Sequence, residues 1–201
     1  MSGSQPEYDE LAAEFVKNKI WQFINRDKEA AVRSILARLR RGLGEKPGAN
    51  PDIWDDTLSN IPEALISKTG IPTMGEWAIY IALTLFAMHQ QGNDPKSVCM
   101  HQKSNSLGRA VRILADRKGE GGEVAIKRRF NATVTSESIE EFSNHLRSMI
   151  QLLKAESISL DYEQLTRDLF WFQIPDMRDR LRLRWGQDYY RSNAALFLEN
   201  E

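Results

Sequence analysis

The run Trp77-Ala-Ile-Tyr-Ile-Ala-Leu-Thr-Leu-Phe-Ala-Met88 decides the fold, because it is apolar nearly all round a helix. A surface helix carries one apolar stripe, whereas a helix that is apolar on every side is buried. Residues 73–91 therefore predict a buried central helix. The run is too short to span a bilayer and it contains Thr84, so we do not expect a membrane-spanning segment here.

Helical periodicity also dominates the chain on both sides of this run. Ser138 and Glu141 have the spacing of a capping box at the start of one apolar stripe. Pro175 suits the first turn of another helix. The expected helices are 8–25, 28–42, 51–59, 73–91, 106–118, 122–131, 138–154, 160–173 and 175–192.

Strand signals are nearly absent, and the best alternating run, Ala132 to Thr135, is short. Segments rich in Gly, Pro, Asn and Lys predict loops at 44–51, 92–105 and 117–122. The predicted fold class is all-α, a bundle of about eight helices over residues 8–196. A division into two packed lobes, 8–100 and 101–196, is an alternative to a single body. Residues 1–7 and 197–201 are predicted to be flexible tails.

Composition is that of an ordinary globular protein, with 41% hydrophobic and 27% charged residues among 201. The single cysteine, Cys99, excludes an internal disulfide and a cysteine-only zinc site, and suits a reducing compartment. The first ten residues are polar and acidic and lack the layout of a secretory signal. We therefore expect a soluble, cytoplasmic protein.

Basic residues are concentrated in three segments, although the formal net charge is only −1. Residues 26–46 hold seven basic residues against three acidic ones, residues 101–129 eight against three, and residues 178–184 four against one. Such segregation can leave a basic face on a nearly neutral protein, and a polyanion would feel that face. The alternative is that these charges lie on solvated helix faces beside local acidic partners.

Residues typical of catalysis or metal binding do not form a recognisable set. Cys99 and His101 lack a second pair at zinc-ligand spacing. His145 lies beside an apolar stripe and is expected to be a partly buried helix residue, and His89 could compensate a helix dipole. The segment Gly119 to Glu123 lacks the Lys-Ser/Thr ending of a phosphate-binding loop. The sequence predicts no enzyme activity, no metal and no cofactor.

The arginines flank apolar stripes, so their side chains can reach solvent while the stripes pack inward. Arg147 and Lys154, seven residues apart, lie on one flank of their expected helix. Arg112 stands four residues before Asp116, and an internal ion pair is the simpler prediction for it. Arginine outnumbers lysine in all three segments, and its planar fork suits phosphate oxygens. Few aromatic residues interleave, so backbone contact is favoured over base stacking.

Several short motifs, taken in order, resemble the CasB family, the small subunit of the type I-E CRISPR Cascade surveillance complex. The resemblance covers roughly residues 30–190 and includes an early arginine pair in Leu39-Arg-Arg41. The motifs are Ser106-Leu-Gly-Arg-Ala110, Lys127-Arg-Arg-Phe130, His145-Leu-Arg147, Leu160-Asp-Tyr162, Asp168-Leu-Phe-Trp171 and Trp185-Gly-Gln-Asp-Tyr189.

This resemblance implies an all-α, non-catalytic subunit for antiviral defence. It implies two copies in the complex, beside the large subunit and the backbone subunits that coat the guide RNA. Contact with the guide RNA, the target DNA and the displaced strand would stabilise the R-loop. The implied nucleic-acid-binding residues are Arg40, Arg41, Lys103, Arg109, Arg128, Arg129, Arg147, Arg180 and Arg182.

Two other classes of function fit the residues. A helical protein–protein scaffold would use the same arginines to pair with acidic surfaces of partner proteins. A helix-turn-helix regulator is less well supported, because Phe172-Gln-Ile-Pro175, before the arginine-rich helix, is short and holds no Gly.

Overall fold

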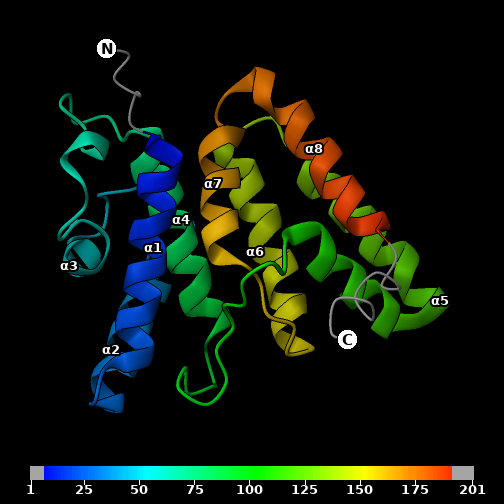
Figure 1. The fold of residues 1–201 in the computed structure, drawn as a ribbon, viewed down its shortest axis with the longest axis horizontal. Coiled ribbons are helices and arrows are strands. Elements are labelled where there is room, and N and C mark those ends of the chain that lie inside the picture. Colours follow the sequence, from blue (N-terminus) through cyan, green and yellow to red (C-terminus); the bar gives the residue numbers. More distant parts are fainter. Residues whose placement is uncertain (1–6, 192–201) are drawn as a thin grey trace, which may run out of the picture.

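The computed structural model describes residues 7–191, apart from the side chain of Glu120. This range contains no strand, and only an isolated β-bridge joins His101 to Leu160. The all-α prediction is confirmed, whereas the predicted tails, except for Glu7, lie outside the described residues. The helices (Figure 1) are α1 (Tyr8–Asn25), α2 (Glu29–Arg41), α3 (Trp54–Thr57), α4 (Met74–His89), α5 (Leu107–Val134), α6 (Ile139–Ala155), α7 (Tyr162–Phe172) and α8 (Pro175–Tyr190), with 3₁₀ turns η1 (Pro51–Ile53) and η2 (Glu63–Leu65).

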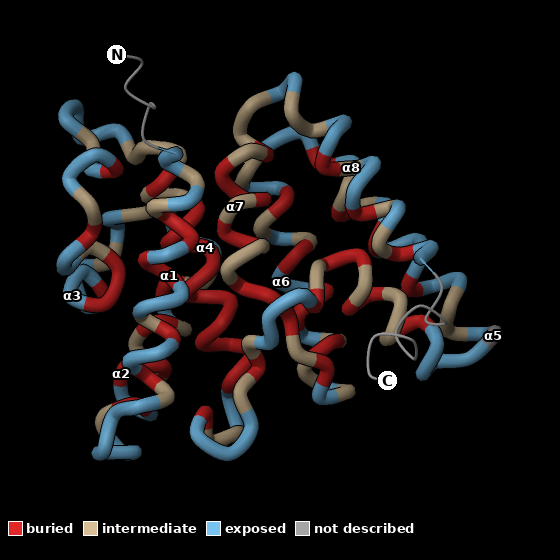
Figure 2. Tube along the Cα trace, in the orientation of Figure 1, coloured by how far each residue is buried: buried red, intermediate tan, exposed pale blue. Residues whose placement is uncertain are grey.

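Helix α4 lies at the centre of the fold. It begins at a complete capping box, in which the Thr73 hydroxyl accepts from the Glu76 amide (3.1 Å) and the Glu76 carboxylate accepts from the Thr73 amide (2.7 Å). Every residue from Ala78 to His89 is buried (Figure 2). Helices α1, α2, α6 and α7 pack around it. The predicted buried central helix is confirmed.

Helices α5 and α8 approach each other closely at Gly108, in the first turn of α5. A Cβ added at Gly108 would overlap the carbonyl oxygen of Trp185 and lie 3.0 Å from the Tyr189 amide nitrogen. Ser106, the N-cap residue of α5, donates a hydrogen bond to the Asp188 carboxylate of α8 (2.7 Å). This crossing therefore requires a residue without a side chain.

A buried carboxylate joins α7 to α8. Asp168 is 1% exposed and accepts hydrogen bonds from the Gln164 amide (2.8 Å), the Trp185 indole (2.6 Å) and Arg184. Burial raises the pKa of Asp168, and the Arg184 charge and these hydrogen bonds oppose that shift. A buried carboxylate is tolerated only when it is paired and hydrogen-bonded, so these donors fix α8 against α7.

Buried hydrophobic residues form one cluster that runs from Ala12 in α1 to Tyr189 in α8. Within it, Phe142 of α6 stacks on Phe172 (ring centroids 4.2 Å apart) and on Trp185 (5.4 Å). The two halves considered as lobes, 8–100 and 101–196, both contribute residues to this core.

Two predicted helix boundaries are wrong. A loop at 117–122 is absent, because the helix continues on both sides of Gly119 and only this residue leaves helical geometry (φ 66°, ψ −175°). Glycine adopts such a positive φ without a steric penalty, so a single residue makes the kink. The expected helix 51–59 is instead the 3₁₀ turn η1 followed by the single turn of α3, and the chain then bends at Asn60 (φ 63°).

Three local predictions also differ in detail. Ala132 to Val134 form the last turn of α5 rather than an extended run. Ser138 accepts from the Glu141 amide (3.1 Å), but the Glu141 carboxylate accepts from the Glu137 amide instead of completing a capping box. His89 does not compensate the α4 dipole with a charge: it is buried beside the Tyr162 hydroxyl (Nδ1 to oxygen 3.0 Å), and burial lowers its pKa to about 4.

Substitution of Gly108 by alanine is expected to lower the free energy of unfolding by about 1–3 kcal/mol, because the new Cβ overlaps the backbone of α8. Gly121→Ala is the matched control on the same helix, since nothing lies within 4 Å of a Cβ added there. Removing glycine from this exposed helical position should leave stability equal or slightly higher. Urea denaturation measures both, and equal losses for the two variants would contradict the close crossing.

The free energy of unfolding is expected to fall as pH drops from about 6.5 to 4. The unfolded chain then takes up a proton on His89, whose pKa in the folded protein is only about 4. The decrease in the free energy of unfolding that comes from His89 is on the order of 3 kcal/mol. Urea denaturation across this pH range should show a shallower dependence for His89→Gln, and equal slopes for the two proteins would refute a neutral buried histidine.

Candidate nucleic-acid interface

The nine predicted contact residues fall into three groups by the surroundings of their side chains. Arg40 is half-buried against a backbone carbonyl, and Arg41 and Arg182 form ion pairs. The others make no ion pair with any residue of the described range, and all but the half-buried Arg109 are exposed. This last group is Lys103, Arg109, Arg128, Arg129, Arg147 and Arg180.

Arg40 and Lys154 are brought together from α2 and α6. Arg40 donates to the Ala87 carbonyl near the end of α4 (3.4 Å), and Lys154 donates to the Gln91 side chain just after α4 (3.0 Å). Burial lowers the pKa of Arg40. Burial and then the nearby Arg40 charge lower the pKa of Lys154. In the described part of the chain, no carboxylate lies within ion-pair distance of either cation, and the nearest acids that share a hollow with Arg40 are Glu29 and Asp94.

Arg147 extends this positive region. It is exposed on α6, two helical turns before Lys154. Its guanidinium lies 3.9 Å from the place where a Cβ of Gly44 would stand, so α6 runs beside the loop that follows α2. We call Arg40, Arg147 and Lys154 the α2–α6 basic patch. Arg41, at the end of α2, pairs with Asp52 (3.3 Å), but both side chains are 62% exposed, and such a pair contributes little.

Lys154 is a patch member that the sequence-based candidates omitted. Lys154 stands seven residues after Arg147, and this helical spacing is the signal in the sequence that points to it. Helical spacing does not show that α6 brings Lys154 near Arg40, 114 positions earlier in the chain.

Lys103 and Arg109 lie near the start of α5 in different surroundings. Arg109 donates to the Ser104 carbonyl (3.5 Å) and has no acidic partner in the described range. Lys103 lines a hollow of about 510 Å³ that also holds side chains of both signs. Its charged neighbours there are Glu10, Asp161, Glu163, Arg167, Arg184 and Asp188. The acids make this hollow a poor place for phosphate.

The second half of α5 carries Arg128 and Arg129 on its outer side. Ile126 and Phe130 are buried, as their spacing predicts, and both arginines are exposed. Lys127 instead turns toward α8, where its amine lies 5.3 Å from the centre of the Tyr190 ring. In the first half of α5, the predicted pair of Arg112 with Asp116 is confirmed (2.5 Å), and Glu123 pairs with Arg112 as well (3.3 Å).

The arginines of α8 serve mainly internal contacts. Arg182 pairs with Glu137 (3.2 Å) and Asp179 (3.0 Å), and donates to the Val134 carbonyl at the end of α5 (2.9 Å). Arg184 binds the buried Asp168. Arg180, by contrast, is exposed and has no ion pair among residues 7–191. Of the two α8 candidates, only Arg180 is free to meet a phosphate without breaking an internal contact.

The described residues offer neither a cluster of metal ligands nor a helix suited to span a membrane. Between residues 7 and 191, no group of three or more His, Cys, Asp and Glu is arranged to hold a metal ion. No helix in this range combines the length and the apolar character of a membrane span. His145 is half-buried on α6, as predicted, with Glu141 3.8 Å away.

The fold and the surface together define a class of protein: an all-α protein that carries separate patches of cations. The family model of the CRISPR-associated protein Cse2 matches residues 35–190, and the chain belongs to this family. The resemblance predicted from the sequence is thereby confirmed. Family membership makes the chain a subunit of the Cascade complex of CRISPR defence, with a structural role.

Two solved structures share the fold. CasB from Thermobifida fusca is 26% identical, with a TM-score of 0.71, and the match covers 91% of this chain and 97% of that one. CasB from Thermus thermophilus is 21% identical, with a TM-score of 0.61 and coverage of 92% and 98%. No curated protein matches the chain.

Arg182→Ala is expected to lower the free energy of unfolding by about 1–2 kcal/mol, because it removes charged hydrogen bonds that join α8 to the end of α5. Arg180→Ala, two residues away, removes the same charge from an exposed position and should change stability by less than about 0.5 kcal/mol. Chemical denaturation distinguishes them, and equal effects would contradict the internal role of Arg182.

Proposed function

We propose that this Cascade subunit is non-catalytic and binds nucleic-acid backbone through basic helix faces, thereby stabilising the R-loop. The observation that carries the proposal is the placement of Arg40 and Lys154, which the fold holds near each other with no acid in ion-pair distance among the described residues. Two cations held in this way repel each other. A bound phosphate would relieve that repulsion, so the site favours a polyanion.

Backbone contact is the appropriate chemistry for this role. In RNA-guided recognition, base pairing reads the sequence, and contacts between protein and backbone shift a nearly balanced exchange of strands. The exposed cations of α5, Arg128 and Arg129, and Arg180 of α8 would add contacts that need no particular base. The proposed partners are the guide RNA, both strands of the target, the large subunit, the backbone subunits and a second copy of this chain.

A protein–protein scaffold is the second candidate, and the acidic neighbours of Lys103 favour it for that part of the surface. In a scaffold, the exposed arginines would pair with carboxylates of neighbouring subunits. The two functions differ in what happens when cations are removed: a scaffold loses the subunit from the complex, whereas a backbone clamp keeps the subunit and loses affinity for the target.

Removal of two patch charges, Arg147→Gln with Lys154→Gln, is expected to weaken target binding by the assembled complex and shorten the R-loop lifetime. Each lost phosphate contact should reduce the slope of log affinity against log salt by about 0.7–0.9. Charge reversal at Arg109 and Arg128 should act in the same direction. Binding to a matched target duplex, measured across a salt series, tests both sets.

Lys68→Gln is the matched control, because it removes an exposed cation from the loop before α4 rather than from a patch. The control should leave affinity and salt slope unchanged. If the subunit acts as a backbone clamp, its amount in the purified complexes must be the same for the variants and the unchanged protein. Intact complexes with unaltered affinity would refute the clamp, and loss of the variant subunit would support the scaffold.

A further inference from the structure

The end of α4 holds the two cations of the α2–α6 basic patch that lie near each other. Arg40 donates to the Ala87 carbonyl in the last turn of α4 (3.4 Å). Lys154 donates to the side-chain oxygen of Gln91, two residues after the helix ends (3.0 Å). The last carbonyls of a helix carry partial negative charge, which favours a cation beside them. Both cations are therefore anchored on one short stretch of chain.

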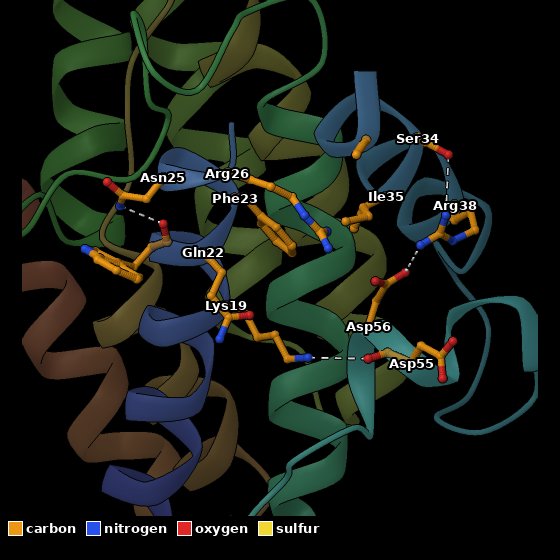
Figure 3. Close-up of a pocket in the computed structure, with 12 residues that line it drawn as sticks. Lys19, Gln22, Phe23, Asn25, Arg26, Ser34, Ile35, Arg38, Asp55 and Asp56 are labelled. Atoms are coloured by element: carbon orange, nitrogen blue, oxygen red, sulfur yellow. Dashed lines mark hydrogen bonds and ion pairs between the residues drawn. The ribbon is translucent and has the colours of Figure 1, made fainter. Parts of the chain in front are cut away.

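Both anchors are uncharged acceptors, unlike the anchor of a neighbouring arginine on α2. Arg38, on the opposite flank of this helix from Arg40, pairs with the Asp56 carboxylate (3.0 Å), as Figure 3 shows. A carboxylate cancels the charge of its partner, whereas a carbonyl or amide oxygen orients a cation and leaves its charge in place. The end of α4 can therefore hold Arg40 and Lys154 without neutralising either of them.

The turn that carries Gln91 is fixed from inside by its neighbour, Gln90. The Gln90 side chain is fully buried and makes three hydrogen bonds to backbone groups of residues 93–100 (2.7–3.1 Å). A buried amide that is satisfied in this way ties the segment after α4 to the body of the protein. The backbone of Gln91 is thus held in place, while its own side chain is exposed and reaches Lys154.

Lys154 needs an anchor to stay near Arg40. Its side chain is half-buried, and burial and then the Arg40 charge lower its pKa, which shows that this position disfavours the ammonium. A lysine side chain also has large rotamer freedom and readily extends into solvent. Without an acceptor at Gln91, repulsion by Arg40 would drive the ammonium outward.

We propose that Gln91 is a positioning residue of the α2–α6 basic patch: its side-chain oxygen holds the Lys154 ammonium near Arg40 and leaves both charges available to an anion. Gln91 acts through Lys154 and needs no contact of its own with nucleic acid. The use of this placement rests on the proposed binding of nucleic-acid backbone. The placement itself can be measured in the free protein, so the two proposals can fail separately.

The pKa of the Lys154 amine, followed by NMR in the free full-length subunit, tests the placement. Gln91→Leu should raise this pKa, because the released side chain moves into solvent and away from Arg40. If other contacts held Lys154 in place, loss of the acceptor would lower the pKa or leave it unchanged, and either result overturns the proposal. The matched control, Gln22→Leu, should leave the pKa unchanged. Gln22 is exposed on α1, and its side chain makes no hydrogen bond with the other residues drawn in Figure 3.

Binding of a matched target duplex by the assembled complex tests the use of this placement. Gln91→Leu removes no charge, and it should still weaken binding about two- to fivefold. This loss should vanish when Lys154→Gln is already present, since Gln91 acts only through Lys154. An equal loss in both backgrounds would contradict the positioning role.

Gln91→Glu separates anchoring from charge. The new carboxylate would still hold Lys154, but it would form an ion pair and cancel the charge of the ammonium. Binding should weaken, and the slope of log affinity against log salt should fall by about 0.7–0.9, as it does when one phosphate contact is lost. Unaltered affinity and slope in this variant would refute the need for an uncharged anchor. A raised Lys154 pKa in Gln91→Leu without any loss of affinity would confirm the placement and overturn the binding function of the patch.

Discussion

The need to cover α4 constrains every other element of this protein. A helix with buried residues on all sides from Ala78 to His89 cannot stand at an edge, because exposing it would cost about 25 cal/mol for each Å² of apolar surface. Helices α1, α2, α6 and α7 supply the cover, and α5 and α8 are then added outside α6 and α7. The outer sides of the peripheral helices therefore form the surface of the protein, and the basic segments lie on them.

The same constraint explains why the free cations form separate patches. An arginine on the inner flank of a peripheral helix meets backbone carbonyls and acids of its neighbours, as Arg182 and Arg184 do. An arginine on the outer side, such as Arg128, meets none within the described range. Only the second kind can bind phosphate without first breaking an internal contact. The arginines available for the proposed binding are therefore different from those that hold the fold together, sometimes two residues apart on one helix.

The sequence predicted the helices well, but it predicted poorly which cations are engaged in internal ion pairs. Periodicity is a local property, so the stretches 8–25 and 138–154 correspond closely to α1 and α6. The break at Gly119 was predicted in the right place but as a loop over 117–122, because three nearby glycines look alike in sequence and only one adopts a positive φ. Ion pairing has a local and a long-range part: Arg182 pairs with Asp179, three residues earlier, and also with Glu137, 45 residues away. Helical spacing offers a carboxylate to both arginines, Asp179 to Arg182 and Asp176 to Arg180, so spacing alone does not show that Arg182 is engaged while Arg180 has no ion pair among the described residues.

The motifs that carry the family resemblance are largely packing motifs, and this limits what the resemblance can say about binding. Gly108 lies in Ser106-Leu-Gly-Arg-Ala110 and touches Trp185, which opens Trp185-Gly-Gln-Asp-Tyr189. Asp168, which opens a third motif, binds the Trp185 indole. These residues meet at one junction of α5, α7 and α8, where geometry permits few alternatives. Contact with a nucleic-acid backbone needs charge on a surface rather than one fixed residue. The scaffold can therefore be recognised from short motifs, while the binding surface must be read from how the fold distributes its cations.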